Sequence, residues 1–157
     1  MAFEIERRFL IKNDNWKEFI NKKVYIEQGY FSKSFDGWII RVRLIGKNSK
    51  ITLKKHIKGF TNFEFKYSIP RRDAETIMSN LSSKIKKERF FLKVKTKSWI
   101  IDCFKGNNYP LEIAEIELSN EEEDLFLPSF IAKEITGMTQ YSNFSLANNP
   151  FSEWKED

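Results

Sequence analysis

The 157-residue sequence contains very little cysteine, histidine, glycine or proline: one, one, six and four residues respectively. The single cysteine, Cys103, excludes a disulfide within the chain and a thiolate metal cluster. No apolar run is long enough to span a membrane, and the first residues lack the basic and apolar regions of a signal peptide. A chain of this length, with so few linker residues, is the size of one ordinary domain. We therefore expect a single domain, residues 1–157, in the cytoplasm.

The charge balance is basic. Lysine and arginine total 27 and aspartate and glutamate total 22, which gives a net charge of +5 and a pI of about 9.2. This balance favours an anionic partner: nucleic acid, a membrane surface or a phosphorylated small molecule. With 41% hydrophobic and 31% charged residues, the composition is that of a globular protein.

Strand-like alternation of apolar and polar residues recurs along most of the chain. About eight antiparallel strands can close into a barrel whose interior holds side chains or one small ligand. Helices are expected over 14–22 and 71–82, from a capping box at Ser119 to just before Pro128, and over 129–134. The fold class is therefore α+β. The predicted strands span 2–11, 24–32, 37–46, 50–57, 62–69, 86–95, 98–105 and 112–119.

The alternation also separates charge from apolar side chains. In FEIERRFL, residues 3–10, Glu4, Glu6 and Arg8 share one strand face, with Phe3, Ile5 and Phe9 on the other. A half-solvated sheet would look similar, but such faces usually mix Ser, Thr, Gln and Lys, whereas most of these positions are Arg or Glu. The other strands repeat the pattern with Arg41 and Arg43, Thr52 and Lys54, Glu64 and Lys66, Lys87 and Arg89, Asp102, and Glu115 and Glu117.

Acids pair on the first and last strands, and bases pair on the middle ones. Because the first and last strands of a closed barrel are neighbours, Glu4, Glu6, Glu115 and Glu117 would form one cluster facing a basic wall. Crowded carboxylates have raised pKa values unless a cation neutralises them. Mg²⁺ does this with oxygen ligands, and arginine forks suit phosphate oxygens. The pattern predicts a site for a polyphosphate.

These residues resemble a known family. EIERRF resembles the E-x-E-x-K signature that opens the CYTH domain of the triphosphate tunnel metalloenzymes. The resemblance continues in order along nearly the whole chain, and the ordered set is specific. Its later parts are QGY at 28–30, the charged pairs given above, WIIDCF with Asp102, AEIEL with Glu115 and Glu117, KEIT at 133–136 and YSNFSLA at 141–147.

The resemblance implies a closed antiparallel barrel that forms a charged tunnel, with helices packed outside. It also implies Mg²⁺ or Mn²⁺ and a triphosphate substrate: inorganic tripolyphosphate, thiamine triphosphate, an RNA 5′ end, or ATP cyclised to cyclic AMP. The opening is most similar to small bacterial members that hydrolyse inorganic triphosphate. Hydrolysis of tripolyphosphate to pyrophosphate and phosphate is the expected activity.

Roles follow from the charges and the resemblance together. Lys54 is the expected general base, because a lysine among other cations has a lowered pKa. Tyr30 is expected to orient it, since a Lys–Tyr pair is proposed for similar members. The expected metal ligands are Glu4, Glu6 and Glu117, with Glu64, Asp102 and Glu115 as further ligands. The expected phosphate ligands are Arg8, Arg41, Arg43, Lys54, Lys87 and Arg89.

The sequence departs from the family pattern in places. Arg8 replaces a lysine, and Asn62 and Lys66 stand where a base and an acid are usual. Gln140 stands where an arginine often precedes the final tyrosine. Lys66 is expected to weaken binding of a second cation.

Other functions stay open: a class IV-type adenylate cyclase, a thiamine triphosphatase, or a non-catalytic polyphosphate or nucleotide binder. No membrane or nucleic-acid partner is expected, because most phenylalanines fall on the apolar strand faces and not on the charged one. The sequence leaves a homodimer open.

Overall fold

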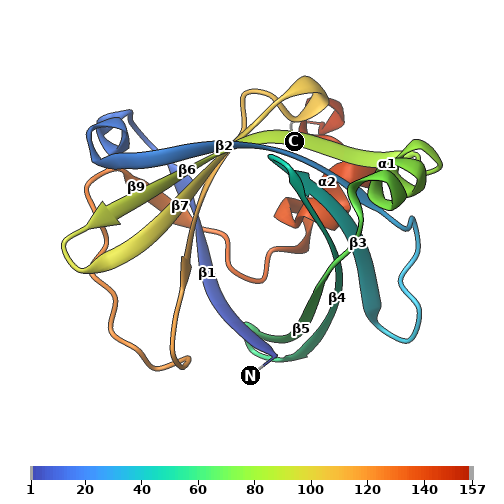
Figure 1. Cartoon of the computed structure of the whole chain (residues 1–157). Coiled ribbons are helices and arrows are strands. Elements are labelled where there is room, and N and C mark those ends of the chain that lie inside the picture. Colours follow the sequence, from blue (N-terminus) through green and yellow to red (C-terminus); the bar gives the residue numbers. More distant parts are fainter. Residues whose placement is uncertain (1, 156–157) are drawn as a thin grey trace.

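The computed structural model describes residues 2–155, which form a ring of strands (Figure 1). The strands are β1 (Phe3–Ile11), β2 (Ile20–Tyr30), β3 (Trp38–Ile45), β4 (Asn48–Lys58), β5 (Thr61–Ser68), β6 (Ser83–Val94), β7 (Lys97–Phe104), β8 (Glu112–Glu117) and β9 (Ile131–Glu134). The α-helices are α1 (Arg71–Ser79) and α2 (Asn143–Asn148), and short 3₁₀ helices span Asn15–Phe19, Gly106–Asn108, Thr139–Tyr141 and Phe151–Glu153.

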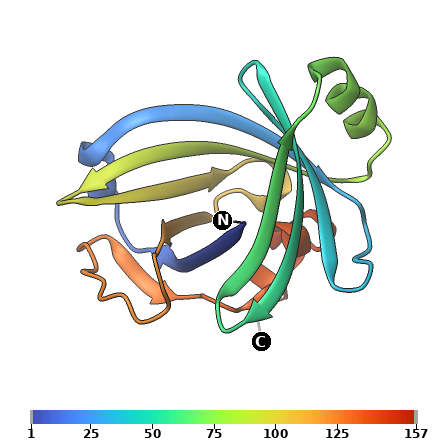
Figure 2. The ribbon, with the colours of Figure 1, turned by 60° about the horizontal axis from the view of Figure 1, so that its bottom comes forward.

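The predicted closed barrel of eight antiparallel strands is confirmed. The hydrogen-bonded order is β5-β4-β3-β2-β6-β7-β8-β1, and β1 pairs back onto β5. Along its second edge β1 changes neighbour: Phe3–Ile5 pair with β5, whereas Phe9 and Ile11 pair with β9. Figure 2 shows β9, in orange, beside dark-blue β1. The ninth strand therefore extends the sheet without entering the closed ring.

Two of the predicted helices are wrong. Residues 129–134 contain β9, because the free edge of β1 offers backbone partners to this segment. The stretch after Ser119 is a turn followed by irregular chain. There the Asn120 side chain accepts from the Glu122 N–H, and the Glu123 carboxylate accepts from the Ser119 N–H. Such local bonds compete with helix formation.

The predicted helix over 14–22 is shorter than expected. It is a 3₁₀ helix over Asn15–Phe19, and β2 begins directly after it at Ile20. Trp16 is 1% exposed and packs edge-on against Phe90, with ring centroids 5.1 Å apart. The tryptophan therefore anchors a short turn on the outer barrel wall. The predicted helix over 71–82 ends at Ser79.

The barrel interior has two parts. Inward positions at one end are apolar, namely Leu10, Ile85, Phe104 and Ile113, and they pack together with Leu146 of α2. We call this part the apolar end; the C-terminal segment, residues 135–154, closes it. In Figure 1, red α2 lies partly inside the outline of the ring. The charged inward side chains lie beyond this end, together with a few uncharged ones such as Phe91 and Ile100.

The outer wall is covered unevenly. Helix α1 packs Ala74 and Met78 against Val42 and Leu44 of β3, outside the ring (Figure 1). Gly29 allows this approach, since a Cβ there would lie 2.8 Å from the Met78 sulfur. Within residues 2–155, none of the helices has the length and apolar character needed to cross a membrane.

Candidate functional site

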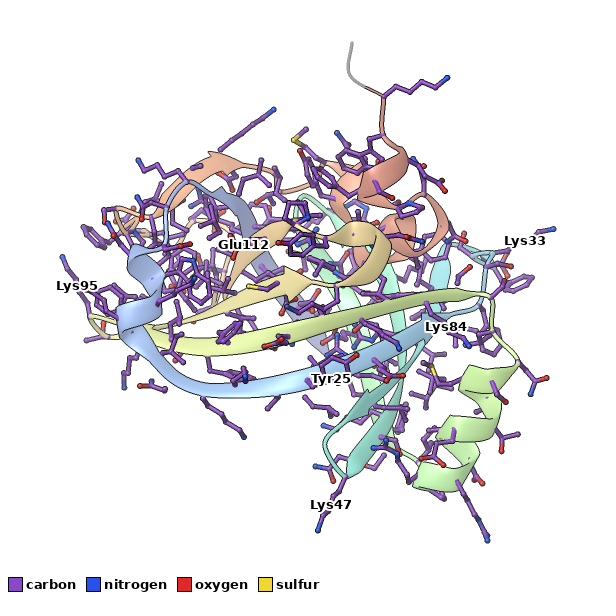
Figure 3. All side chains as sticks on the ribbon, turned by 90° about the horizontal axis from the view of Figure 1, so that it is seen from above. Tyr25, Lys33, Lys47, Lys84, Lys95 and Glu112 are labelled. Atoms are coloured by element: carbon purple, nitrogen blue, oxygen red, sulfur yellow. The ribbon has the colours of Figure 1, made fainter. Side chains whose placement is uncertain are left out.

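A cavity of about 490 Å³ lies inside the barrel, beyond the apolar end. Every predicted site residue except Asp102 lines it. Side chains of opposite parity on the same strands, such as Tyr25 and Lys84, lie on the outer surface (Figure 3). The strand register therefore brings residues from the first and last thirds of the chain into one site. The predicted set that lines it is Glu4, Glu6, Arg8, Tyr30, Arg41, Arg43, Lys54, Glu64, Lys87, Arg89, Glu115 and Glu117.

The acidic side of the cavity centres on Glu6. In the β1–β8 pairing Glu6 lies opposite Glu117, and Arg8 lies opposite Glu115. Burial, followed by the nearby Glu115 and Glu4 carboxylates, raises the pKa of Glu6 to about 8. Without a cation, Glu6 therefore keeps its proton at neutral pH. A hard divalent cation with oxygen ligands would replace that proton and relieve the repulsion.

Most of the other carboxylates already have a cationic partner. Lys54 Nζ lies 2.6 Å from Glu4 Oε1, and Lys66 Nζ lies 3.0 Å from Glu64 Oε1. Arg8 Nε donates to Glu115 Oε1 at 3.2 Å. In this arrangement no three potential ligands among residues 2–155 converge on one point that could hold a metal ion. The oxygen donors suit Mg²⁺ or Mn²⁺ chemically, but the lysines would have to turn from the acids to complete a ligand set.

The expected lowering of the Lys54 pKa is wrong. Burial alone would lower it, but Glu6 and Glu4 outweigh burial and raise the pKa above its ordinary value. The physical reason is that Lys54 lies across β4–β5 from Glu64 and against Glu4, and not among other cations. The lysine with a lowered pKa is Lys87: burial, together with Arg89 and Arg43, lowers it to about 7 against the opposing effect of Asp102.

Tyr30 is not paired with Lys54. Its hydroxyl accepts a hydrogen bond from Gln28 Nε2 at 2.9 Å, and its ring packs edge-on against Phe144 with centroids 5.8 Å apart. The expected orientation of Lys54 by Tyr30 therefore has no contact to support it. Tyr30 forms part of the wall between the cavity and the apolar end.

Asp102 lies beneath the basic wall and not on the cavity surface. It is 0% exposed, and its carboxylate accepts from Arg89 Nε and Nη2 at 2.8 and 2.9 Å and from Lys87 Nζ at 2.7 Å. Burial would raise its pKa, but Arg89 and Lys87 hold it well below its usual range. Its expected place among metal ligands is thus taken by two cations, because the β6–β7 register sets Asp102 opposite Arg89. It supports the cations that face the cavity.

Two arginines present donors without partners. Arg8 Nη2 and Arg41 Nε are buried and make no hydrogen bond to any atom of residues 2–155. Arg41 uses only Nη2, which donates to Thr52 Oγ1 at 3.0 Å. A buried polar group without a partner costs about 1–3 kcal/mol, and more when it is charged. An anion with several oxygens, bound in the cavity, would satisfy both groups.

Two residues that the sequence reasoning did not assign also shape the site. Gln28 Oε1 accepts from Arg43 Nε at 2.9 Å, and Asn143 Oδ1 accepts from Lys87 Nζ at 2.8 Å. Both lie in the matched segments QGY and YSNFSLA, where each is a polar residue near apolar ones. Lys66 lies opposite Thr52 and lines the cavity, which confirms the predicted register of β5.

Comparison with known proteins identifies relatives whose names and folds agree with one another. No family model matches the chain. The inorganic triphosphatase of Acetivibrio thermocellus is 35% identical over 158 residues, which cover 99% of this chain and 100% of that protein. The crystal structure of the inorganic triphosphatase NE1496 is 26% identical with a TM-score of 0.68, over 94% of this chain and 95% of that one. A putative adenylate cyclase from Bacillus halodurans shares the fold, at 15% identity and a TM-score of 0.60 over 78% of this chain and 84% of that one.

Proposed function

Because the chain belongs to the CYTH family of triphosphate tunnel metalloenzymes, we propose that it hydrolyses inorganic tripolyphosphate to pyrophosphate and phosphate. The observation that carries this proposal is the pair of buried, unpartnered guanidinium donors of Arg8 and Arg41. Both arginines line the cavity inside the barrel, together with the carboxylates of Glu4, Glu6, Glu64, Glu115 and Glu117. A linear anion with many oxygens matches this wall better than a singly charged one.

The basic side would bind the phosphates. Arg41 and Arg43 on β3 and Lys87 and Arg89 on β6 line one side, and Arg8 projects from β1. Phosphoanhydride hydrolysis depends mainly on positioning and on stabilising developing charge. Cations already held by buried partners need little rearrangement when that charge develops. These five residues are therefore the proposed phosphate ligands.

The acidic side would hold Mg²⁺ or Mn²⁺. Glu6 and Glu117 are the leading ligands, with Glu4, Glu64 and Glu115 as further ones. A divalent cation held by these carboxylates would supply Lewis-acid stabilisation for the bound phosphate chain. Asp102 is left out of this set, because its carboxylate is enclosed by Lys87 and Arg89.

Lys54 is proposed as a further phosphate ligand and not as a general base. The charged carboxylate of Glu4 lies 2.6 Å from Lys54 Nζ and holds the ammonium protonated, so it has no free electron pair with which to accept a proton from water. When a phosphate and a divalent cation enter, Lys54 can turn from Glu4 to a phosphate oxygen. This exchange would free Glu4 for the metal. Tyr30 is proposed to hold the cavity wall in place through its contacts with Gln28 and Phe144.

Steady-state assays of tripolyphosphate, ATP and thiamine triphosphate, each with Mg²⁺ and with Mn²⁺, test the proposal. Phosphate and cyclic AMP are both measured. The expected result is a higher kcat/KM for tripolyphosphate than for ATP, and no turnover in EDTA. Cyclic AMP as the main product would indicate a cyclase, and anion binding that survives EDTA without turnover would indicate a binding module. We expect a cytoplasmic enzyme with a small-molecule substrate and no nucleic-acid partner.

A further inference from the structure

A hydrogen-bonded chain connects the C-terminal segment to the basic wall. Asn143 is the first residue of α2. Its side-chain oxygen accepts from Lys87 Nζ at 2.8 Å and from Gln28 Nε2 at 3.1 Å. The segment that closes the apolar end therefore also reaches the charged part of the barrel.

The ammonium of Lys87 is held between two acceptors. Lys87 is 0% exposed and donates to Asp102 Oδ2 at 2.7 Å as well as to Asn143. An ammonium has three protons, so one stays available for a ligand in the cavity. Asp102 is already engaged by Arg89 through both of its oxygens. Without Asn143, the ammonium would be drawn toward Asp102 alone and away from the cavity that Lys87 lines.

The same oxygen links cations on two different strands. Gln28 donates to Asn143 and accepts from Arg43 Nε at 2.9 Å. Gln28 is itself 0% exposed, and a third bond, which its Nε2 donates to the Tyr30 hydroxyl, fixes its amide. Asn143 thus joins Lys87 on β6 to Arg43 on β3 through one buried amide.

We propose that Asn143 is a positioning residue that acts through Lys87 and holds its ammonium toward the bound phosphate chain. This inference rests on the proposed function, in which Lys87 is a phosphate ligand. In this proposal, the segment that closes the apolar end and the lysine that binds the anion belong to one hydrogen-bonded unit. An asparagine elsewhere on α2 should have no such effect.

The chain offers a matched control on the same helix. Asn148 Oδ1 accepts from Ser83 Oγ at 2.7 Å, so it also ties α2 to β6, but among the described residues 2–155 its side chain bonds only to Ser83 and to the Phe144 carbonyl. Calorimetric titration with tripolyphosphate, without divalent cation, compares the two positions. We expect Asn143→Ala to weaken binding about tenfold, as loss of one charge-assisted bond does. Asn148→Ala should stay within about twofold of the unsubstituted protein. Equal affinities for Asn143→Ala and the unsubstituted protein would overturn the inference.

A double-mutant cycle separates positioning from direct contact. In a Lys87→Met background, Asn143→Ala should change affinity less than about twofold, since there is no ammonium left to position. A loss of about tenfold in both backgrounds would mean that Asn143 contacts the anion itself, and would overturn the inference. If Asn143→Ala does not fold, Asn143→Ser keeps a shorter oxygen acceptor. It should then lose at least about threefold, again only when Lys87 is present.

The two proposals fail in different ways. The binding cycle can show coupling between Asn143 and Lys87 while the unsubstituted protein fails to hydrolyse tripolyphosphate. That result would refute the proposed function and leave the inference standing. Hydrolysis without coupling would refute the inference alone.

Discussion

The charged part of the barrel interior and the apolar end are built from the same strands and the same inward positions. On β1 the inward residues run from Glu6 and Arg8 to Leu10, and on β6 they run from Arg89 and Lys87 to Ile85. The apolar end is packed with the C-terminal segment, whereas the charged part keeps donors without partners. Packed apolar surface stabilises a fold, and buried charge does so weakly at best. One interior is thus divided along each strand into a part that supplies stability and a part available for binding and chemistry.

The largest expected effect lies in the charged part. Glu6→Gln and Glu117→Gln should each lower kcat/KM for tripolyphosphate about a thousandfold, since a metal ion contributes several kcal/mol of charge stabilisation. Thermal stability of metal-free Glu6→Gln should not fall, because a neutral amide replaces a carboxyl that is already protonated at neutral pH. Steady-state kinetics and a thermal melt of each variant measure the two quantities.

The control for these variants is Glu112→Gln. Glu112 lies on β8 like Glu117, but on the outer surface, where its carboxylate accepts from the Cys103 thiol (Figure 3). Its kcat/KM should match that of the unsubstituted protein. Activity close to the unsubstituted level in both Glu6→Gln and Glu117→Gln would remove the metal assignment.

The apolar end should show the opposite behaviour. Leu146 is 0% exposed, and Leu146→Ala should lower the free energy of unfolding by about 2–5 kcal/mol. The measurement is urea-induced unfolding, with kcat determined per folded molecule. Turnover should stay within about threefold, as the leucine does not line the cavity. A loss of kcat per folded molecule well beyond threefold would show that the two parts of the interior are not separable.

Removing an unpartnered donor tests the basic wall. Arg41→Met should raise the KM for tripolyphosphate about 10–100-fold, the value of one or two charge-assisted bonds. Arg7→Met provides the control, because Arg7 lies on the outer side of β1 and pairs with Glu134 at 2.8 Å. An unchanged KM in Arg41→Met would show that its orphaned Nε does not serve the substrate.

The pH dependence of stability tests the crowding around Glu6. Its pKa is raised from 4.5 to about 8, mainly by burial, so the protonated form favours folding. That contribution is complete below 4.5 and is lost as the pH rises through 8. The Tm of the metal-free protein should therefore fall by about 5 °C or more between pH 5 and pH 9, as a loss of one to two kcal/mol would produce. Glu4, whose pKa is lowered to about 2 by Lys54 against the opposing effect of burial, contributes stability that is present above pH 4.5 and is lost only as the pH falls toward 2.

Two comparisons check whether the pH dependence of Tm originates at Glu6. Glu6→Gln should flatten the fall in Tm, and saturating Mg²⁺ should reduce it in the unsubstituted protein. An equally steep fall in Glu6→Gln would assign the pH dependence to other groups.

The smallest effect is expected at the rim. The Lys66 side chain is 46% exposed and pairs with Glu64, so solvent screens its charge. Lys66→Glu should raise KM about two- to fivefold and let activity respond to lower Mg²⁺ concentrations, because a second cation binds more tightly without the lysine. Lys84→Glu, on the outer surface, is the control (Figure 3). Superimposable Mg²⁺ titrations of Lys66→Glu and the unsubstituted protein would show that Lys66 does not influence the anion.

The period-2 pattern predicted the barrel and nearly all of the charged residues that line the cavity, because strand parity alone decides which side chains face inward. It could not predict which charges pair. Lys54 meets Glu4 through barrel closure, and Asp102 meets Arg89 through the β6–β7 register. Neither contact is visible in local sequence, so the Lys54 pKa was wrongly predicted and the enclosure of Asp102 by Lys87 and Arg89 was not foreseen.

The C-terminal region was harder to predict for a related reason. Strand β9 exists because the second edge of β1 is left free beyond its pairing with β5. Asn143 reaches Lys87 because α2 closes the apolar end. Both depend on packing between segments far apart in sequence. No short pattern in those segments encodes them.

Time-resolved ³¹P NMR of tripolyphosphate mixed with the protein tests the central claim most directly. It identifies every phosphorus species without a coupled assay. With Mg²⁺ or Mn²⁺, the tripolyphosphate signals should be replaced by equal amounts of pyrophosphate and phosphate, and excess EDTA or Glu6→Gln should stop the conversion. Persistence of tripolyphosphate with either metal, or equal conversion in EDTA, would contradict the account of a metal-assisted triphosphatase in the charged part of the barrel.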